Sequence, residues 1–275
     1  MKLRDEFSRK ATSYDSAAVL AREVGSRLAE RIDLVRLAPR RVADIGCATG
    51  DGLRELQRRY PDALPLAVDF ARPMLQAVAA RSTWLERLRS RAPLCVNADV
   101  RSLPLANDSL DLVWSNLMLH WLPDLRPAFA EIQRVLAAGG LLQFAMLGPD
   151  TLKELRVLGA PIANFSDMHD IGDMLVTAGF ADPVMEMEIL TLTYETPRRF
   201  LADQRRLGVR DALLGSLGWR QWRKLFAAWQ RVDGVLPARF EIIYGHAWKV
   251  MPKVMTEVTA AGSSVIHFDR MARKP

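Results

Sequence analysis

The chain has 275 residues, of which 49% are hydrophobic and 25% are charged, and its formal net charge is +6. This composition is typical of a globular protein with a sizeable core, and it excludes a disordered or fibrous chain. Two cysteines exclude a disulfide scaffold and favour a reducing compartment. No hydrophobic run approaches the roughly 20 residues that cross a bilayer, and the N-terminus lacks a signal-peptide centre. We therefore expect a cytoplasmic protein without a membrane segment.

The first 38 residues carry hydrophobic side chains at helical spacing, and Pro39 ends that region. Strands and helices then alternate, which predicts parallel βαβ units. The expected strands span residues 41–46, 64–69, 94–99, 110–116 and 141–147. The expected helices span residues 53–60, 72–82 and 124–136, and Gly139 and Gly140 are expected to end the last of them.

The pattern changes after residue 148. Two helices are expected at 151–159 and 167–180, followed by a strand at 183–194. An inserted helical pair is expected at 198–208 and 219–232, before a closing antiparallel strand at 240–250.

The sequence therefore predicts an α/β fold with a doubly wound, mostly parallel, seven-stranded sheet. The domains are expected to be an N-terminal helical lid (1–40), a main domain (41–250) with an insert at about 197–232, and a weakly ordered tail (251–275).

The segment VADIGCATG carries a glycine-rich turn directly after the first expected strand. Gly46 and Gly50 allow a sharp turn and a close approach of backbone N–H groups to a ligand. Ala48 stands where a third glycine would fall, and we expect it to be tolerated if its φ is negative. Asp44 disfavours an anionic ligand and suits one with a cationic centre. An ordinary structural turn is the alternative.

Two further acids follow the next two expected strands. Asp69 ends LPLAVD and could accept hydrogen bonds from a ribose diol, and Asp99 ends LCVNAD and could bind beside an adenine. Each alone could be a helix N-cap. Because parallel strand ends meet at one edge of a sheet, three acids at successive ends favour a ligand site.

The segments VADIGCATG, AVDF, NADV and LPLANDSLDLVWSNLMLHWLPD resemble the class I S-adenosylmethionine-dependent methyltransferases over residues 41–147. The resemblance implies S-adenosylmethionine as the cofactor, with Asp69 on the ribose, Asp99 and Val100 at the adenine, and Asn116 near the reacting methyl. The implied cofactor-binding residues are Asp44, Gly46, Cys47, Ala48, Gly50, Asp69, Phe70, Met74, Asp99, Val100 and Asn116.

The flanking segments FSRKATSYDSAA, GPDTLKELR and FSDMHDIGDMLVTAGFADPVMEME are similar to the malonyl-acyl-carrier-protein O-methyltransferases of biotin synthesis, over most of residues 7–250. This resemblance implies methylation of the free carboxylate of a malonyl thioester. The implied partner is malonyl-acyl carrier protein, which is acidic, or malonyl-CoA. Residues 198–231 carry nine basic and two acidic side chains and could dock such a partner, although a solvated helical surface explains them equally well.

Forked guanidinium groups suit a carboxylate substrate. The candidate substrate-binding residues are Arg9, Arg198, Arg199, Arg205 and Arg206, each of which could instead form surface ion pairs. Tyr14, Asn116 and His120 are the candidate catalytic residues, and packing is the alternative for Tyr14 and His120. The remaining histidines show no metal-ligand spacing, so no metal is expected.

Two other interpretations stay open, and a third is disfavoured. One is a complex I assembly factor that hydroxylates a protein arginine, because that class shares this core and a similar LHW stretch. Another is a cofactor-binding module without turnover. A nucleic-acid methyltransferase is disfavoured because SNLMLHW replaces the Asn/Asp-Pro-Pro-aromatic motif, so no nucleic-acid partner is expected.

Overall fold

The structure is a computed structural model that describes residues 2–84, 91–250, 257–258 and 264–265. The N-terminal segment consists of α1 (Lys2–Lys10), the short 3-10 helix η1 (Tyr14–Ser16) and α2 (Val19–Ile32). None of the described helices is long and apolar enough to span a bilayer.

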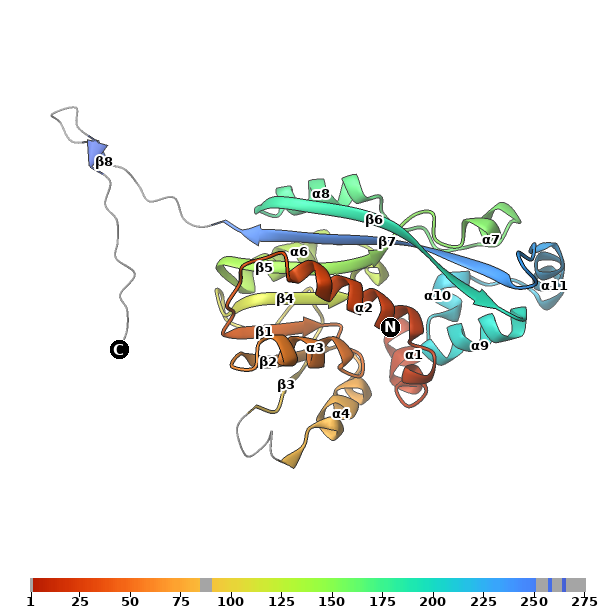
Figure 1. Cartoon of the computed structure of the whole chain (residues 1–275), viewed down its shortest axis with the longest axis horizontal. Coiled ribbons are helices and arrows are strands. Elements are labelled where there is room, and N and C mark those ends of the chain that lie inside the picture. The colour runs from red at the N-terminus through yellow and green to blue at the C-terminus, as the bar shows by residue number, and fades with distance from the viewer. Residues whose placement is uncertain (1, 85–90, 251–256, 259–263, 266–275) are drawn as a thin grey trace.

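A seven-stranded sheet follows, with the order β3-β2-β1-β4-β5-β7-β6 (Figure 1). The first five strands pair in parallel, and β7 is antiparallel to both of its neighbours. The predicted fold class is therefore confirmed. The strands are β1 (Arg41–Ile45), β2 (Leu64–Asp69), β3 (Leu94–Asn97), β4 (Leu110–Asn116), β5 (Leu136–Leu147), β6 (Phe180–Tyr194) and β7 (Leu236–Lys249).

Each face of the sheet carries its own hydrophobic core, because alternate strand residues point to opposite sides. On β1, Val42 packs into one core, and Ala43 and Ile45 pack into the other. The first core is covered by α2, α3 (Asp51–Arg59) and α4 (Arg72–Arg81). The second is covered by α6 (Arg126–Val135) and α8 (Met168–Thr177). Both faces of the parallel part are thus buried, as such a sheet requires.

One expected boundary and the expected number of helices in the insert were wrong. Helix α6 ends at Val135 and β5 begins at Leu136, so Gly139 and Gly140 lie within the strand rather than ending the helix. Gly139 adopts a φ of +73° there, which glycine permits without strain. The insert contains three helices instead of two: α9 (Pro197–Leu207), α10 (Arg210–Leu214) and α11 (Trp219–Ala228).

The long strands β6 and β7 carry the insert beyond the parallel part of the sheet, toward the side where α1 lies (Figure 1). Helix α1 contacts both α4 and α9. Ser13 donates to the backbone carbonyl of Arg206 at 3.0 Å, so the N-terminal segment and the insert are joined. Short elements α7 (Lys153–Val157) and η2 (Leu119–Trp121) complete the main domain.

Most of the tail predicted to be weakly ordered lies outside the described residues. Within it, Glu257–Val258 (β8) and Ser264–Val265 (β9) form an antiparallel pair.

Candidate functional site

A cavity of about 610 Å³ lies at the carboxyl ends of the parallel strands. The strand order reverses between β1 and β4, and open α/β sheets bind ligands beside such a reversal. The ends of β1, β2 and β4 supply one part of the wall, and α1 and α9 supply another. The strand ends therefore form one side of the site, and the N-terminal segment and the insert enclose it.

The glycine-rich turn forms the floor of this cavity. Gly46 has a φ of +76°, and a Cβ atom there would lie 2.3 Å from the Met118 side chain. Glycine is therefore required by both backbone and packing. Ala48 also adopts a positive φ, of +45°, so the condition under which we expected alanine to be tolerated, a negative φ, is not met. The loop keeps its left-handed turn and places a methyl-bearing residue in it.

Asp69 organises that turn. One carboxylate oxygen accepts the Ala48 N–H at 3.0 Å, and the other accepts the Ala71 N–H at 2.7 Å. Burial raises the pKa of Asp69 to about 6, against the opposing effect of these two N–H donors. Asp69 lines the cavity, so its remaining lone pairs are available to a ligand.

Asp44 lies beneath the turn and does not belong to the cavity wall. It is 2% exposed, and a Cβ atom on Gly52 would lie 2.8 Å from its Oδ2. Burial and the nearby charge of Asp69 raise the pKa of Asp44 to about 8, although the Leu53 N–H donates to it. Its contact with the first turn of α3 makes it a support for the loop.

Asp99 also lines the cavity, two residues beyond the end of β3. It accepts the Arg101 N–H at 2.9 Å and pairs with the Arg101 guanidinium at 2.6 Å. These contacts hold the pKa of Asp99 below its usual range. Val100 is buried beside it and lines the same wall.

The N-terminal segment covers the turn. Phe7 and Tyr14 pack with Phe70 and Met74, and the Phe7 and Phe70 rings lie 6.0 Å apart. Burial and surrounding carboxylates raise the pKa of Tyr14, so its phenol stays protonated at neutral pH.

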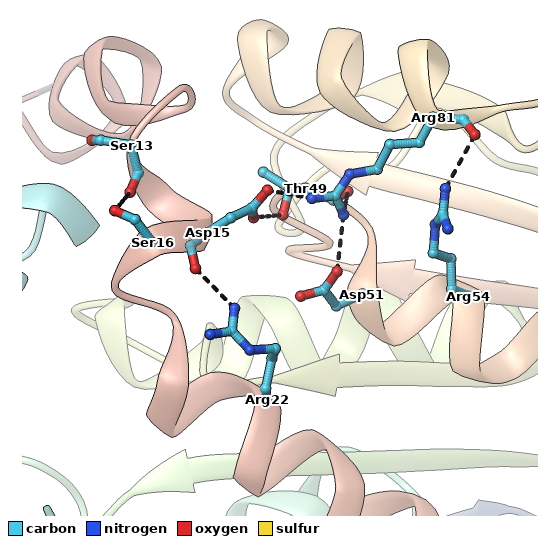
Figure 2. Close-up of polar contacts among 8 residues, drawn as sticks. All are labelled: Ser13, Asp15, Ser16, Arg22, Thr49, Asp51, Arg54 and Arg81. Carbon is cyan, nitrogen blue, oxygen red and sulfur yellow. Dashed lines mark hydrogen bonds and ion pairs between the residues drawn. The ribbon is translucent and has the colours of Figure 1, made fainter.

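Polar contacts attach this cover to the loop, as Figure 2 shows. Asp15, next to Tyr14, accepts from the Thr49 hydroxyl and pairs with Arg81 at the end of α4. Arg81 also donates to the Thr49 carbonyl at 2.7 Å and to Asp51 at 2.9 Å. We call these four residues the cover latch.

Asn116 and His120 line the cavity as well. The Asn116 amide nitrogen donates to the Ala21 carbonyl at 2.8 Å, and its buried Oδ1 has no partner among the described residues. His120 Nδ1 accepts the Leu147 N–H at 3.3 Å. Burial lowers the pKa of His120 to about 3, so its ring is neutral.

The structure brings together most of the predicted site residues. Those that line the cavity are Tyr14, Gly46, Ala48, Asp69, Phe70, Met74, Asp99, Val100, Asn116 and His120. Cys47 and Gly50, like Asp44, support the turn from outside the wall; the Cys47 thiol is buried, which raises its pKa.

The candidate arginines do not reach the cavity wall. Arg9 pairs with Glu6 on α1, and the insert arginines project outward. The exposed insert arginines of the prediction are Arg198, Arg199, Arg205 and Arg206.

Three polar residues that the sequence analysis missed line the cavity, Arg4, Arg101 and Gln204. Gln204 is 3% exposed and follows Phe200 and Leu201 on the buried face of α9. A polar residue on the hydrophobic face of an amphipathic helix was the signal that could have revealed it. Arg4, near the chain start, carried no such signal.

Across the described residues, no group of three or more His, Cys, Asp or Glu side chains could hold a metal ion.

Comparisons with known proteins give the family. A family model described as "Methyltransferase domain" matches residues 43–144. Among solved structures, the YcgJ protein of Bacillus subtilis has a TM-score of 0.60 at 16% identity, covering 82% of this chain and 98% of its own. Phosphoethanolamine N-methyltransferase 2 of Haemonchus contortus, solved with S-adenosyl-L-methionine, has a TM-score of 0.55 at 18% identity, covering 89% and 57%. These two likenesses concern the fold.

Curated relatives are much more similar. The malonyl-[acyl-carrier protein] O-methyltransferase of Gallionella capsiferriformans is 47% identical, with 92% of this chain and 91% of the relative covered. The enzyme of that name from Laribacter hongkongensis is 47% identical, with 90% and 89% covered. The chain belongs to the malonyl-[acyl-carrier protein] O-methyltransferase family.

Proposed function

We propose that the protein transfers a methyl group from S-adenosylmethionine to the free carboxylate of malonyl-acyl carrier protein, giving a malonyl methyl ester. The observation that carries this proposal is the single cavity that joins the carboxylates of two strand ends to a largely hydrophobic region between the N-terminal cover and the insert. Family membership and the predicted cofactor motifs support the same function.

The residues present fit the cofactor. The lone pairs left on Asp69 suit two ribose hydroxyls, and the buried, unpartnered Asn116 Oδ1 suits an ammonium group. Phe70, Met74 and Val100 supply apolar surface for an adenine beside Asp99. When bound, S-adenosylmethionine supplies a methyl group made electrophilic by a cationic sulfur.

The chemistry needs no general base. A malonyl carboxylate, with an ordinary pKa near 4, is ionised at neutral pH. Its oxygen bonds to the methyl carbon, the carbon–sulfur bond breaks, and the electron pair remains on sulfur. Opposite charges disappear in this step, so a dry cavity favours the transition state. Protonated Tyr14 and neutral His120 accord with this, because neither is set up to take a proton.

We assign the malonyl group to residues of the cavity wall and the carrier to residues of the surface. Arg4 and Gln204, which line the cavity, are assigned to the malonyl group. We assign the exposed arginines Arg9, Arg198, Arg199 and Arg205 to the carrier, whose acidic surface they complement. Malonyl-CoA is a second polyanionic substrate that the same arginines could bind.

The relatives favour this reading over the two alternatives, a complex I assembly factor and a cofactor-binding module without turnover. Cytoplasmic location, and the absence of nucleic-acid and membrane partners, remain predictions.

The proposal is tested by incubating the protein with malonyl-acyl carrier protein and methyl-labelled S-adenosylmethionine. Mass spectrometry should show one methyl group on the malonyl unit, released as methanol by mild base. Acetyl-acyl carrier protein, which lacks the free carboxylate, is the control and should remain unlabelled. Label in both carriers, or in neither, would reject the proposal.

A further inference from the structure

His120 lies in η2, which follows β4, and it lines the cavity. Its ring lies 4.6 Å from the Trp121 ring and 5.3 Å from the Phe165 ring, which it meets edge-on at 89°. These aromatic neighbours restrict the ring orientation. The contacts of the two ring nitrogens therefore indicate which of them carries the proton.

The hydrogen bond from Leu147 fixes the tautomer of this ring. A backbone N–H can only donate, so Nδ1 must be the unprotonated nitrogen. A neutral imidazole then carries its proton on Nε2. Burial keeps the ring neutral, and no charged neighbour contributes to that shift of its pKa.

The Nε2–H group is buried and has no partner among the described residues. A buried donor without a partner costs roughly 1–3 kcal/mol. Such a cost is expected where a ligand completes the hydrogen bond, and His120 belongs to the cavity wall.

We propose that His120 is a neutral hydrogen-bond donor that holds an oxygen of the malonyl group through Nε2–H, and is not a proton acceptor. This inference rests on the proposed function and names a specificity residue for it. The bond orients one carboxylate or carbonyl oxygen without neutralising the carboxylate charge. A neutral donor leaves more of that charge on the nucleophilic oxygen than a second cation beside Arg4 would.

Two amide substitutions separate this role from a structural one. In His120→Gln the amide nitrogen stands near the Nε2 position, so a donor is retained while the Leu147 N–H loses its acceptor. In His120→Asn the amide stands near the Nδ1 position, so the Leu147 contact is retained and the donor is lost. A donor role therefore predicts that His120→Gln is the more active variant. A structural role through the Leu147 contact predicts that His120→Asn is the more active one.

The donor role predicts that His120→Asn lowers kcat/KM for malonyl-acyl carrier protein about 10- to 100-fold, mainly through KM, because the carboxylate charge is largest before transfer. His120→Gln should stay within about threefold of the wild type on the same scale. Thermal unfolding and S-adenosylhomocysteine binding serve as controls for folding and the cofactor site. Equal activities, or better activity in His120→Asn, would overturn the proposal.

The pH dependence of kcat/KM provides a second test of the donor role. Asp69, with a pKa of about 6, could give an inflection in kcat/KM, and this inflection should persist in His120→Gln. If His120 were a base, an inflection of the wild type would disappear in that variant.

Nitrogen NMR of the wild-type imidazole is independent of turnover. A protonated Nε2 and unprotonated Nδ1 are expected from pH 5 to 9, and addition of malonyl-pantetheine should shift the Nε2 signal. The opposite tautomer, or an unchanged signal at saturation, would refute the donor role even if the enzyme proved to act on another acceptor.

Discussion

Ala48 shows how a single residue can hold a glycine position at a cost. Its φ of +45° is unfavourable for a residue with a Cβ atom, by roughly 1–2 kcal/mol. The turn survives because Asp69 binds its N–H and Val68 accepts from both Gly46 and Cys47.

Replacing Ala48 with glycine should therefore stabilise the protein. The relieved strain is partly offset by the entropy of glycine, so we expect a gain of about 0.5–1 kcal/mol, or about 2 °C in Tm. Gly50→Ala is the matched opposite, since Gly50 has a φ of +92° and its added Cβ would lie 3.0 Å from Val78. Differential scanning calorimetry should show Tm rising in the first and falling in the second; a lower Tm for Ala48→Gly would contradict the strain.

Asp69 makes cofactor binding dependent on pH. Accepting hydrogen bonds from two ribose hydroxyls requires the ionised carboxylate, whose pKa in the free protein is about 6. Ligand binding should thus be constant above about pH 7 and weaken as pH falls through 6, up to tenfold per unit. Calorimetry with S-adenosylhomocysteine between pH 5 and 8 measures this. In Asp62→Asn, which changes an exposed acid, the pH dependence should be unchanged; affinity that rises on acidification would refute the assignment.

The strand-end residues could be predicted because their positions follow from chain order alone. Asp69 and Gly46 had to meet once the sheet was parallel. Gln204 and Arg4 could not be found this way, since their place depends on how the insert and α1 fold back over the sheet. The φ of Ala48 depends on hydrogen bonds that the loop N–H groups donate to Val68 and Asp69 of the neighbouring strand, and no local sequence pattern predicts them.

At the scale of elements, the N-terminal segment behaves as a cover attached by side chains. The cover latch joins η1 to the loop after β1 and to the end of α4 (Figure 2). Because Arg81 and Asp15 are partly exposed, each ion pair contributes modestly, about 0.2–1 kcal/mol.

Loss of the latch should accelerate ligand release. In Asp15→Ala we expect S-adenosylhomocysteine to dissociate about three- to tenfold faster, through loss of an ion pair and a hydrogen bond. Asp108→Asn removes an exposed pair with Lys249 and should leave the rate unchanged. Stopped-flow fluorescence provides the rates; identical release from Asp15→Ala and the wild type would show that the cover is not held by these contacts.

Element identities were more predictable than element ends. Hydrophobic spacing gave the strands and most helices, whereas the boundary between α6 and β5 is set by pairing of Leu110 with Leu136, a contact far apart in sequence. The short helix α10 was missed because five residues hold too little periodicity.

Across the molecule as a whole, a basic surface lies on a helix that contributes to the cavity wall. Helix α9 carries Arg198, Arg199, Arg205 and Arg206 and contacts α1, and both helices contribute to the cavity wall. An acidic carrier bound there would present its thioester arm to the cavity.

The double variant Arg198→Glu and Arg205→Glu should raise KM for malonyl-acyl carrier protein at least tenfold, because it reverses charge on the proposed docking surface. KM for malonyl-pantetheine, which lacks the protein, should change far less. Arg58→Glu, on the outer side of α3, is the control. Steady-state kinetics at low and moderate salt measure the difference; equal effects on both substrates would place the carrier elsewhere.

The function proposed for this protein depends on S-adenosylmethionine binding in the strand-end cavity. Titration calorimetry at pH 7.5 with S-adenosylhomocysteine, on the wild type and on Asp69→Ala, measures that binding. We predict one-to-one binding by the wild type and affinity lower by about 10- to 100-fold in the variant. Equal affinities for the two proteins, or no binding by the wild type, would contradict binding in this cavity.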